Sequence, residues 1–204
     1  MNLRARASEH ARVSTPRVVL ASGSPRRREL LASIVAAFDV SVPDVDESVR
    51  GDESPEDYVE RLALDKARAI VRPESLVIAA DTTVVVDGRI IGKPIDRAHA
   101  RAMLQQLSGV THRVFTGVAV LIDDRVRSAV VTTDVTFVAL SSADIDWYVE
   151  TGEPDDKAGA YGMQGTGNAF VASIDGSPSN VIGLPLSTVV SLARDLGVDL
   201  LTSR

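Results

Sequence analysis

Three consecutive arginines, residues 26–28, open an expected helix and form the first group in the chain that could bind a ligand. The apolar run 18–20 before them predicts a short buried strand, while Ser24 suits an N-cap and Pro25 suits the first helical position. A helix N-terminus carries about +0.5 of a charge, so cations are unfavourable there unless an anion binds. Free backbone N–H groups, the helix dipole and guanidinium groups together favour a phosphate-binding turn. The alternative is that these arginines are ordinary solvent-exposed side chains.

A single carboxylate, Asp81, interrupts the most apolar segment of the chain, residues 76–86. Burying an unpaired carboxylate is costly, so we expect Asp81 to be neutralised, to pair with a cation or to bind a metal. The alternative is that neighbouring Thr hydroxyls or backbone N–H groups satisfy it. Asp46 and Glu47 lie in an acidic turn, where solvent exposure is the simpler expectation. Mg²⁺ uses one or two carboxylates together with substrate phosphates, however, so an acid on this loop and Asp81 could share one ion.

Three lysines and one glutamine could also contribute to a site. Lys66 lies close to the apolar face of an expected helix, and Lys93 stands between a Gly and a Pro that restrict its backbone. Lys157 has two acids beside it, so an ordinary ion pair competes with ligand binding. Gln164 lies in the Gly-rich segment 151–168, whose length without periodicity is typical of a functional loop. Its amide offers a donor and an acceptor to a nucleobase edge, or it could cap the loop instead.

The composition indicates a globular protein with a small anionic ligand. The 204 residues carry a net charge of -6, which argues against nucleic acid as a partner because nucleic-acid binding favours a basic face. No apolar run approaches the roughly 18 residues of a membrane span, so we expect no membrane partner. The absence of Cys excludes disulfides, thiolate metal sites and a Cys nucleophile, and it fits a reducing cytoplasm.

The order of predicted elements indicates a single α/β domain over residues 17–204, preceded by a flexible N-terminal tail over residues 1–16. Local patterns predict helices beginning at residues 25 and 54 and over 96–107, 141–148 and 185–196. They predict strands at 38–42, 76–86, 89–91, 112–122, 126–140 and 169–174. Helices therefore alternate with strands while hairpins are inserted, which predicts a mixed sheet.

Eight short motifs follow one another along the chain: residues 21–31, 46–47, 64–67, 80–82, 92–94, 111–117, 156–165 and 180–185. In this order they resemble the Maf family of nucleoside triphosphate pyrophosphatases, over residues 18 to about 196. The resemblance implies an elongated mixed β-sheet with flanking helices and two lobes around a central cleft, as in Maf and ITPase-like proteins. It implies hydrolysis between the α and β phosphates, a divalent metal (Mg²⁺ or Mn²⁺), a possible homodimer and a housekeeping role on nucleotide pools.

The resemblance also assigns roles to residues by matching position. Asp81 resembles the family's proton acceptor and, with Glu47, its metal ligand, while Lys66 and Lys93 correspond to further catalytic residues. The expected substrate-binding residues are Ser22, Arg26, Arg27 and Gln164.

Gln rather than Glu at position 164 resembles the subgroup that acts on dTTP and UTP, with modified pyrimidine nucleotides as further candidates. Two alternatives stay open. One is the same chemistry on another base such as 7-methyl-GTP. The other is a nucleotide-binding regulator of septum formation with little turnover.

Overall fold

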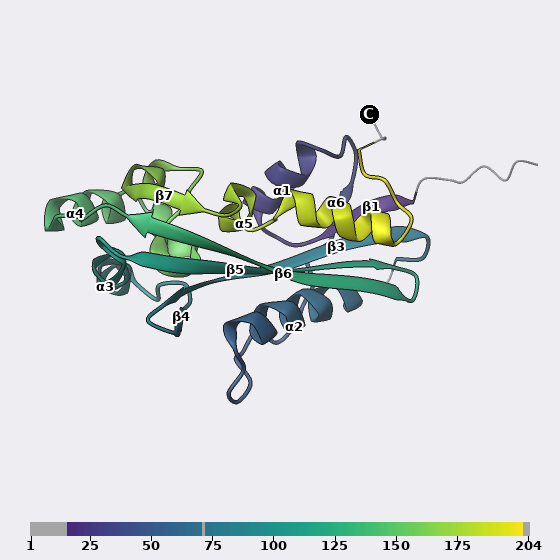
Figure 1. Cartoon of the computed structure of the whole chain (residues 1–204), viewed down its shortest axis with the longest axis horizontal. Helices are drawn as coiled ribbons and strands as arrows, with labels where there is room; N and C mark the ends of the chain where they lie inside the picture. The colour runs from purple at the N-terminus through teal and green to yellow at the C-terminus, as the bar shows by residue number, and fades with distance from the viewer. Residues whose placement is uncertain (1–15, 71, 202–204) are drawn as a thin grey trace, which may run out of the picture.

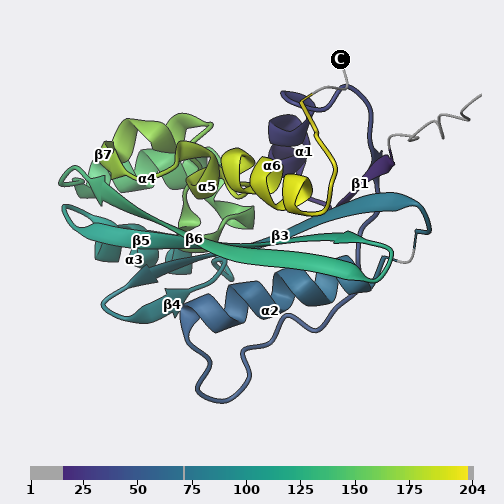
Figure 2. The same ribbon diagram turned by 45° about the vertical axis from the view of Figure 1, so that its right-hand side comes forward.

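The computed structural model describes residues 16–70 and 72–201, so all but Pro16 of the predicted N-terminal tail lies outside the described residues. A long mixed sheet runs through the molecule, with helices on both of its faces (Figures 1 and 2). The α-helices are α1 (Pro25–Ala32), α2 (Pro55–Arg68), α3 (Arg97–Leu107), α4 (Ser142–Glu150), α5 (Pro178–Ile182) and α6 (Leu186–Asp195). The strands are β1 (Arg17–Ala21), β2 (Asp39–Val40), β3 (Ser75–Val86), β4 (Arg89–Ile91), β5 (Thr111–Ile122), β6 (Arg125–Phe137) and β7 (Val171–Asp175). Three 3₁₀ helices complete the described elements: η1 (Glu153–Asp156), η2 (Ala158–Ala160) and η3 (Thr166–Phe170).

The sheet combines parallel and antiparallel pairing, which confirms the predicted mixed α/β fold. Its strand order is β2-β1-β3-β5-β6-β7, and β4 pairs with the end of β3. Strands β2, β1 and β3 are parallel, whereas β3, β5, β6 and β7 form an antiparallel series. Every residue of β3 except the half-buried Thr82 is buried, as expected for a central strand covered on both faces.

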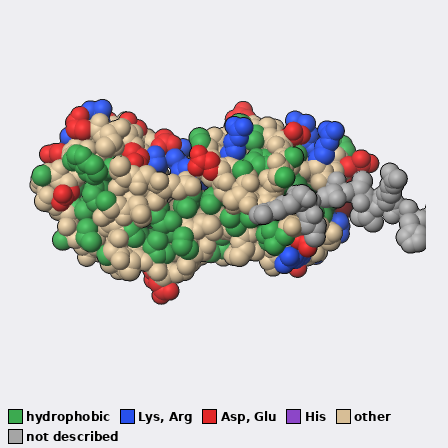
Figure 3. Space-filling model, turned by 90° about the horizontal axis from the view of Figure 1, so that it is seen from above, with side chains coloured by type: hydrophobic (Ala, Val, Ile, Leu, Met, Phe, Trp, Pro, Cys, Tyr) green, Lys and Arg blue, Asp and Glu red, His purple; other side chains and the backbone are tan. Residues whose placement is uncertain are grey.

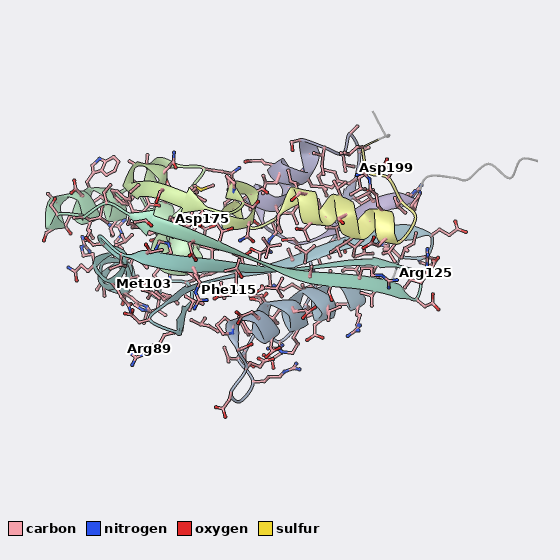
Figure 4. The ribbon with its side chains drawn as sticks, viewed as in Figure 1. Arg89, Met103, Phe115, Arg125, Asp175 and Asp199 are labelled. Carbon is pink, nitrogen blue, oxygen red and sulfur yellow. The ribbon has the colours of Figure 1, made fainter. Side chains whose placement is uncertain are left out.

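Separate apolar cores at the two ends of the sheet give the molecule two lobes. In the α1–α6 lobe, Leu31 and Val189 pack against the first half of β3. In the α3–α4 lobe, Leu104 and Tyr148 pack with the end of β3 and with β6. The labelled side chains of Figure 4 mark these ends, with Met103 on the α3–α4 side and Arg125 at the other end. The family resemblance predicts a cleft between two lobes, and each of the two lobes has its own apolar core.

Helix α2 covers the opposite face of the sheet from α1 and α6 (Figure 2). It approaches β5 so closely at Gly117 that an added Cβ would overlap the backbone carbonyl of Val59. Gly117 is the register partner of Asp81 on β3. A glycine at this position therefore lets α2 bring its side chains to the level of Asp81.

Four element predictions needed correction. The sequence patterns predict no helix between the strand at 169–174 and the helix at 185–196, but Ser177 accepts a hydrogen bond from the Asn180 N–H and caps the short helix α5. The strand predicted at 38–42 contains only Asp39 and Val40, and the strand predicted to reach residue 140 ends at Phe137. The segment 151–168 contains 3₁₀ turns in place of an irregular loop. Within the described residues, no helix is both long and apolar enough to cross a membrane.

Candidate active site

A cavity of about 530 Å³ lies between the two lobes and collects all of the site residues predicted from the sequence. Its walls come from the β1–α1 turn, the loop after β2, helix α2, the middle of β3, the end of β4, residues 156–164 and α5. Seen from above, the surface narrows between the two halves, where basic and acidic side chains gather (Figure 3). The predicted residues in its wall are Ser22, Arg26, Arg27, Glu47, Lys66, Asp81, Lys93 and Gln164.

The start of α1 positions the cationic wall of the cavity. The Ser24 hydroxyl accepts a hydrogen bond from the Arg27 backbone N–H, and Pro25 takes the first helical position, as predicted. The first turn then directs Arg26 and Arg27 into the cavity, whereas exposed Arg28 is absent from its lining. Two of the three arginines thus face a common space that free N–H groups and the helix dipole also favour for an anion.

Three acceptors hold the Arg27 guanidinium. Its Nε donates to the Gly183 carbonyl at 2.8 Å, its Nη1 to the Ser22 hydroxyl at 3.3 Å, and its Nη2 to the Thr82 hydroxyl at 3.1 Å. Burial lowers the pKa of Arg27, and the nearby Asp81 carboxylate opposes this shift. A guanidinium has five N–H donors, so two remain for a ligand.

A chain of hydrogen-bonded hydroxyls holds the Arg27 guanidinium in position. Thr82 and Thr116 lie side by side on β3 and β5 with their hydroxyl oxygens 2.9 Å apart. The Thr116 hydroxyl donates to the Asn180 carbonyl at 3.1 Å, which leaves Thr82 to donate to Thr116 and to accept from Arg27. The position of Arg27 therefore depends on two strands and α5 together.

Arg26 crosses the mouth of the cavity to the opposite lobe. Its Nη1 lies 3.0 Å from Asp156 Oδ2, and Asp156 Oδ1 lies 2.6 Å from Lys157 Nζ. Burial acts to raise the pKa of Asp156, but hydrogen bonds from Lys157 and Arg26 outweigh it and hold the pKa below its ordinary value. An incoming anion would compete with this carboxylate for Arg26.

The acidic wall centres on Lys66, which bridges two carboxylates. Its Nζ lies 2.7 Å from Asp81 Oδ1 and 2.6 Å from Glu47 Oε1. The Lys66 and Asp81 side chains are only 9% and 11% exposed, whereas that of Glu47 is 55% exposed. Of the possibilities weighed for Asp81, the structure shows pairing with a cation. Because Lys66 and Asp81 are both buried, removing either one would leave the other charge without its buried partner.

The loop that carries Glu47 is held against α2. The Tyr58 hydroxyl donates to the Glu47 carbonyl at 2.9 Å, and Arg61 donates to the Ser48 carbonyl at 3.0 Å while pairing with Glu53. Burial acts to raise the pKa of Glu47, but the Lys66 hydrogen bond and the charges of Lys66 and nearby cations keep its pKa below the ordinary value. Burial and the nearby carboxylates raise the pKa of Tyr58 to about 12, so its hydroxyl stays protonated as a donor.

The two carboxylates fit a divalent cation that also binds phosphate. Asp81 and Glu47 each use one oxygen on Lys66, and their second oxygens make no hydrogen bond within the described residues. No group of three or more His, Asp or Glu side chains suited to a metal occurs in the described part of the chain. A metal here would thus take most of its ligands from phosphates and water, which is how Mg²⁺ is usually bound.

Lys93 and Gln164 complete the cavity without being engaged elsewhere. Both are exposed, and neither side chain has a hydrogen bond or ion pair to another described residue. The charge of Lys93 contributes to the lowered pKa of Glu47, which places it on the acidic side. The alternative that Gln164 caps its own loop is not seen, because its amide makes no hydrogen bond to another described residue.

Tyr161 and His112 form a buried pair behind the Gln164 side of the cavity. The Tyr161 hydroxyl lies 2.9 Å from His112 Nε2, and the His112 ring packs edge-on against Phe137 at 5.0 Å. Burial lowers the pKa of His112 to about 4, so the imidazole is neutral near pH 7. His112 therefore supports the cavity wall from behind, since it is buried and outside the lining.

Sequence reasoning did not find the partners that position these side chains. Thr82 follows Asp81 directly, and its neighbour Thr116 belongs to a motif used only for the family resemblance, yet neither was expected to hold Arg27. Asp156 was expected to pair with Lys157 but not with Arg26, which lies 130 residues away in the sequence. No local sequence pattern predicts such pairs, because they form only when the two lobes face each other.

A family model and several sequence relatives match nearly the whole chain. The family model described as "Maf-like protein" matches residues 17–196. A dTTP/UTP pyrophosphatase of Anaeromyxobacter dehalogenans (strain 2CP-C) is 53% identical, covering 91% of this chain and 96% of that protein. A dTTP/UTP pyrophosphatase of Symbiobacterium thermophilum is 52% identical over the same shares. The solved structure of the Staphylococcus aureus Ham1 protein overlaps 59% of this chain and 71% of its own, with 16% identity and a TM-score of 0.43.

Proposed function

The chain belongs to the Maf-like protein family, and from this premise we propose that it is a nucleoside triphosphate pyrophosphatase that hydrolyses dTTP and UTP to the monophosphate and pyrophosphate. The single observation that carries the proposal is the cavity itself, which sets two arginines opposite a Lys-bridged pair of carboxylates. The relatives named dTTP/UTP pyrophosphatase, which match this chain over about nine-tenths of its length, support the choice of substrates.

The cationic wall binds the part of the substrate that leaves. A triphosphate carries about four negative charges, so catalysis depends mainly on positioning and on neutralising charge. Arg27 offers its two remaining N–H donors, and Arg26 exchanges the Asp156 carboxylate for a phosphate at the start of α1. Ser22 orients Arg27 and contributes a hydroxyl to the same end of the cavity. These groups hold the β and γ phosphates.

The acidic wall acts on the water and the reacting phosphate. The second oxygens of Asp81 and Glu47 would hold Mg²⁺ or Mn²⁺, which supplies positive charge to the phosphate when bound. Asp81 accepts the proton of the attacking water at its carboxylate, while Lys66 keeps that carboxylate in place at 2.7 Å. Lys66 and Lys93 offset the charge that develops on the departing pyrophosphate.

The base lies against Gln164. Thymine and uracil present an N–H donor beside carbonyl acceptors, and one amide group complements that pair. Since the Gln164 amide is not engaged with any other described residue, this interaction costs no existing hydrogen bond.

A panel of triphosphates tests the proposal. Pyrophosphate release would be measured with dTTP, UTP, dCTP and 7-methyl-GTP, each with Mg²⁺ and with Mn²⁺. We expect steady turnover of dTTP and UTP and much slower turnover of the other two. Preferred turnover of 7-methyl-GTP would contradict the assigned base, and tight dTTP binding without pyrophosphate release would indicate a nucleotide-binding regulator instead.

We further propose that the protein works in the cytoplasm as a homodimer. A chain without Cys fits a reducing compartment. Light scattering on the purified protein measures its mass directly, and a value near that of two chains is the expected result. A monomer at micromolar concentration would contradict the dimer.

A further inference from the structure

The loop that carries Gln164, defined as residues 162–167 and called the base-reading loop, is anchored by the Glu153 carboxylate together with the Tyr148 hydroxyl. Glu153 Oε2 accepts hydrogen bonds from the backbone N–H and the hydroxyl of Thr166 at 2.8 and 2.6 Å. Glu153 Oε1 accepts from the Gly167 N–H at 3.2 Å and from the Tyr148 hydroxyl at 2.9 Å. The Tyr148 hydroxyl in turn accepts from the Gly162 N–H at 3.0 Å. Both ends of the base-reading loop thus reach one Glu–Tyr pair.

The glycines of the base-reading loop lie directly on this pair. An added Cβ at Gly165 would overlap both carboxylate oxygens of Glu153, and one at Gly167 would overlap the Tyr148 hydroxyl. An added Cβ at Gly162 would overlap the Lys157 side chain first, at 2.6 Å, and would lie 3.0 Å from Glu153 Oε1. Tyr148 is fully buried in the α3–α4 lobe and is held by the packing around it. The position of the base-reading loop relative to the cavity is therefore fixed by that packing.

The Glu153 carboxylate acts as a charged acceptor. Burial acts to raise the pKa of Glu153, but hydrogen bonds from Thr166, Tyr148 and Gly167 outweigh it and keep the pKa below its ordinary value. Four donors converge on its two oxygens, and hydrogen bonds to a charged group are about twice as strong as neutral ones. Its backbone carbonyl also accepts from Lys157 Nζ at 2.6 Å, which ties the anchor to the Asp156–Arg26 contact at the cavity mouth.

We propose that Glu153 is the positioning residue of the base-reading loop and sets the selectivity for thymine and uracil over cytosine through Gln164, without touching the substrate. The inference rests on the proposed function. An amide can present its donor or its acceptor to the base, so its selectivity depends on where the loop holds it. Gln164 has no side-chain partner of its own among the described residues. The position of its amide is therefore set by the loop backbone that Glu153 holds.

The test compares two substrates on the same enzyme preparation. The ratio of kcat/KM for dTTP to that for dCTP would be measured for the wild type, for Glu153→Gln and for Glu153→Asp. The ratio is independent of how much protein is folded, so a purely structural defect leaves it unchanged. In Glu153→Gln one acceptor oxygen becomes an NH₂ group that faces donors, and we expect the ratio to fall by about tenfold, mainly through the KM for dTTP. Glu153→Asp keeps the charge and should restore part of the ratio.

Two further variants make the test decisive. Thr166→Val removes one donor from an exposed position, so it should fold normally and lower the ratio by about threefold. Glu150→Gln changes an exposed glutamate at the end of α4 that pairs with Arg97 and Arg101 of α3, and it should leave the ratio at the wild-type value.

The outcomes separate this inference from the proposed function. An active wild type with an unchanged ratio in both Glu153→Gln and Thr166→Val would overturn the role of Glu153 alone. Equal loss of activity on dTTP and dCTP would do the same. A wild type that releases pyrophosphate from neither dTTP nor UTP would overturn the proposed function and this inference with it.

Discussion

Replacing Asp81 by Asn keeps the shape of the side chain but removes the group that accepts the proton. The remaining amide oxygen can still accept the Lys66 hydrogen bond that spans 2.7 Å in the structure. General-base catalysis contributes about 10²- to 10⁴-fold. We therefore expect kcat for dTTP to fall by about that factor, which corresponds to about 2.7–5.5 kcal/mol of activation free energy. The cationic wall is unchanged, so the KM should stay within about threefold.

The same substitution has a predictable effect on stability. Removing one partner of a buried ion pair costs about 3–5 kcal/mol when the other charge is left alone. Lys66 keeps Glu47 at 2.6 Å, and that side chain is 55% exposed, so the loss should be smaller. We expect the free energy of unfolding to fall by about 1–2 kcal/mol, which leaves a folded protein for the kinetic assay.

The assay is steady-state pyrophosphate release with dTTP, together with equilibrium binding of dTTP. The matched control is Asp87→Asn, which makes the same chemical change in the exposed turn after β3, where Asn tolerates the left-handed backbone (φ 49°). Wild-type kinetics are expected for this control. A kcat for Asp81→Asn within threefold of the wild type would refute the assignment of Asp81 as proton acceptor.

Three other predictions concern the cationic wall, the α2–β5 contact and the buried imidazole. Arg27→Ala removes charge-assisted hydrogen bonds worth about 1.5–3 kcal/mol, so the KM for dTTP should rise by about 10- to 150-fold. Arg28 lies outside the cavity, so Arg28→Ala should change the KM less than twofold. Equal KM values for the two variants would count against the phosphate-binding turn. Gly117→Ala forces a Cβ into the backbone of α2 and should lower the free energy of unfolding, measured by urea titration, by about 3 kcal/mol or more. An added Cβ at Gly92 meets no atom within 4 Å, so Gly92→Ala should change the free energy of unfolding by less than about 0.5 kcal/mol. Burial holds the pKa of His112 at about 4, below the value of about 6.5 in the unfolded chain, so the unfolded state binds more protons between these values and stability rises with pH across that window. Lowering the pH from 7 to 5 should therefore cost about 2 kcal/mol through this residue, and the same urea titrations on His112→Gln should lose that part of the pH dependence; an unaltered pH dependence would contradict a neutral buried imidazole.

Local signals were sufficient for most elements of the fold. Ser24 and Pro25 predict the start of α1, and both occupy the expected cap and first-turn positions. The alternation of apolar runs with helical spacing predicts the mixed sheet, because each element must bury one face. The short helix α5 was not predicted because its Ser-Pro start also suits a turn. Its contacts with Arg27 and β5 hold these five residues as a helix.

The membership of the site was predictable from sequence, but its internal contacts were not. The motif order placed Asp81, Lys66 and Glu47 in one group, and the structure brings them within hydrogen-bonding distance. Their roles stay predictions until activity is measured. Contacts such as Arg26 with Asp156 join the two lobes across 130 residues, and no local spacing encodes them.

Hydrolysis of dTTP in ¹⁸O-labelled water tests the central claim most directly, because it reports which phosphorus the water attacks. The proposed arrangement places the β and γ phosphates on the arginines of α1 and the Asp81-activated water at the α phosphate. It therefore predicts one ¹⁸O atom in dTMP and none in the pyrophosphate. Label in pyrophosphate, or release of orthophosphate and dTDP, would contradict it.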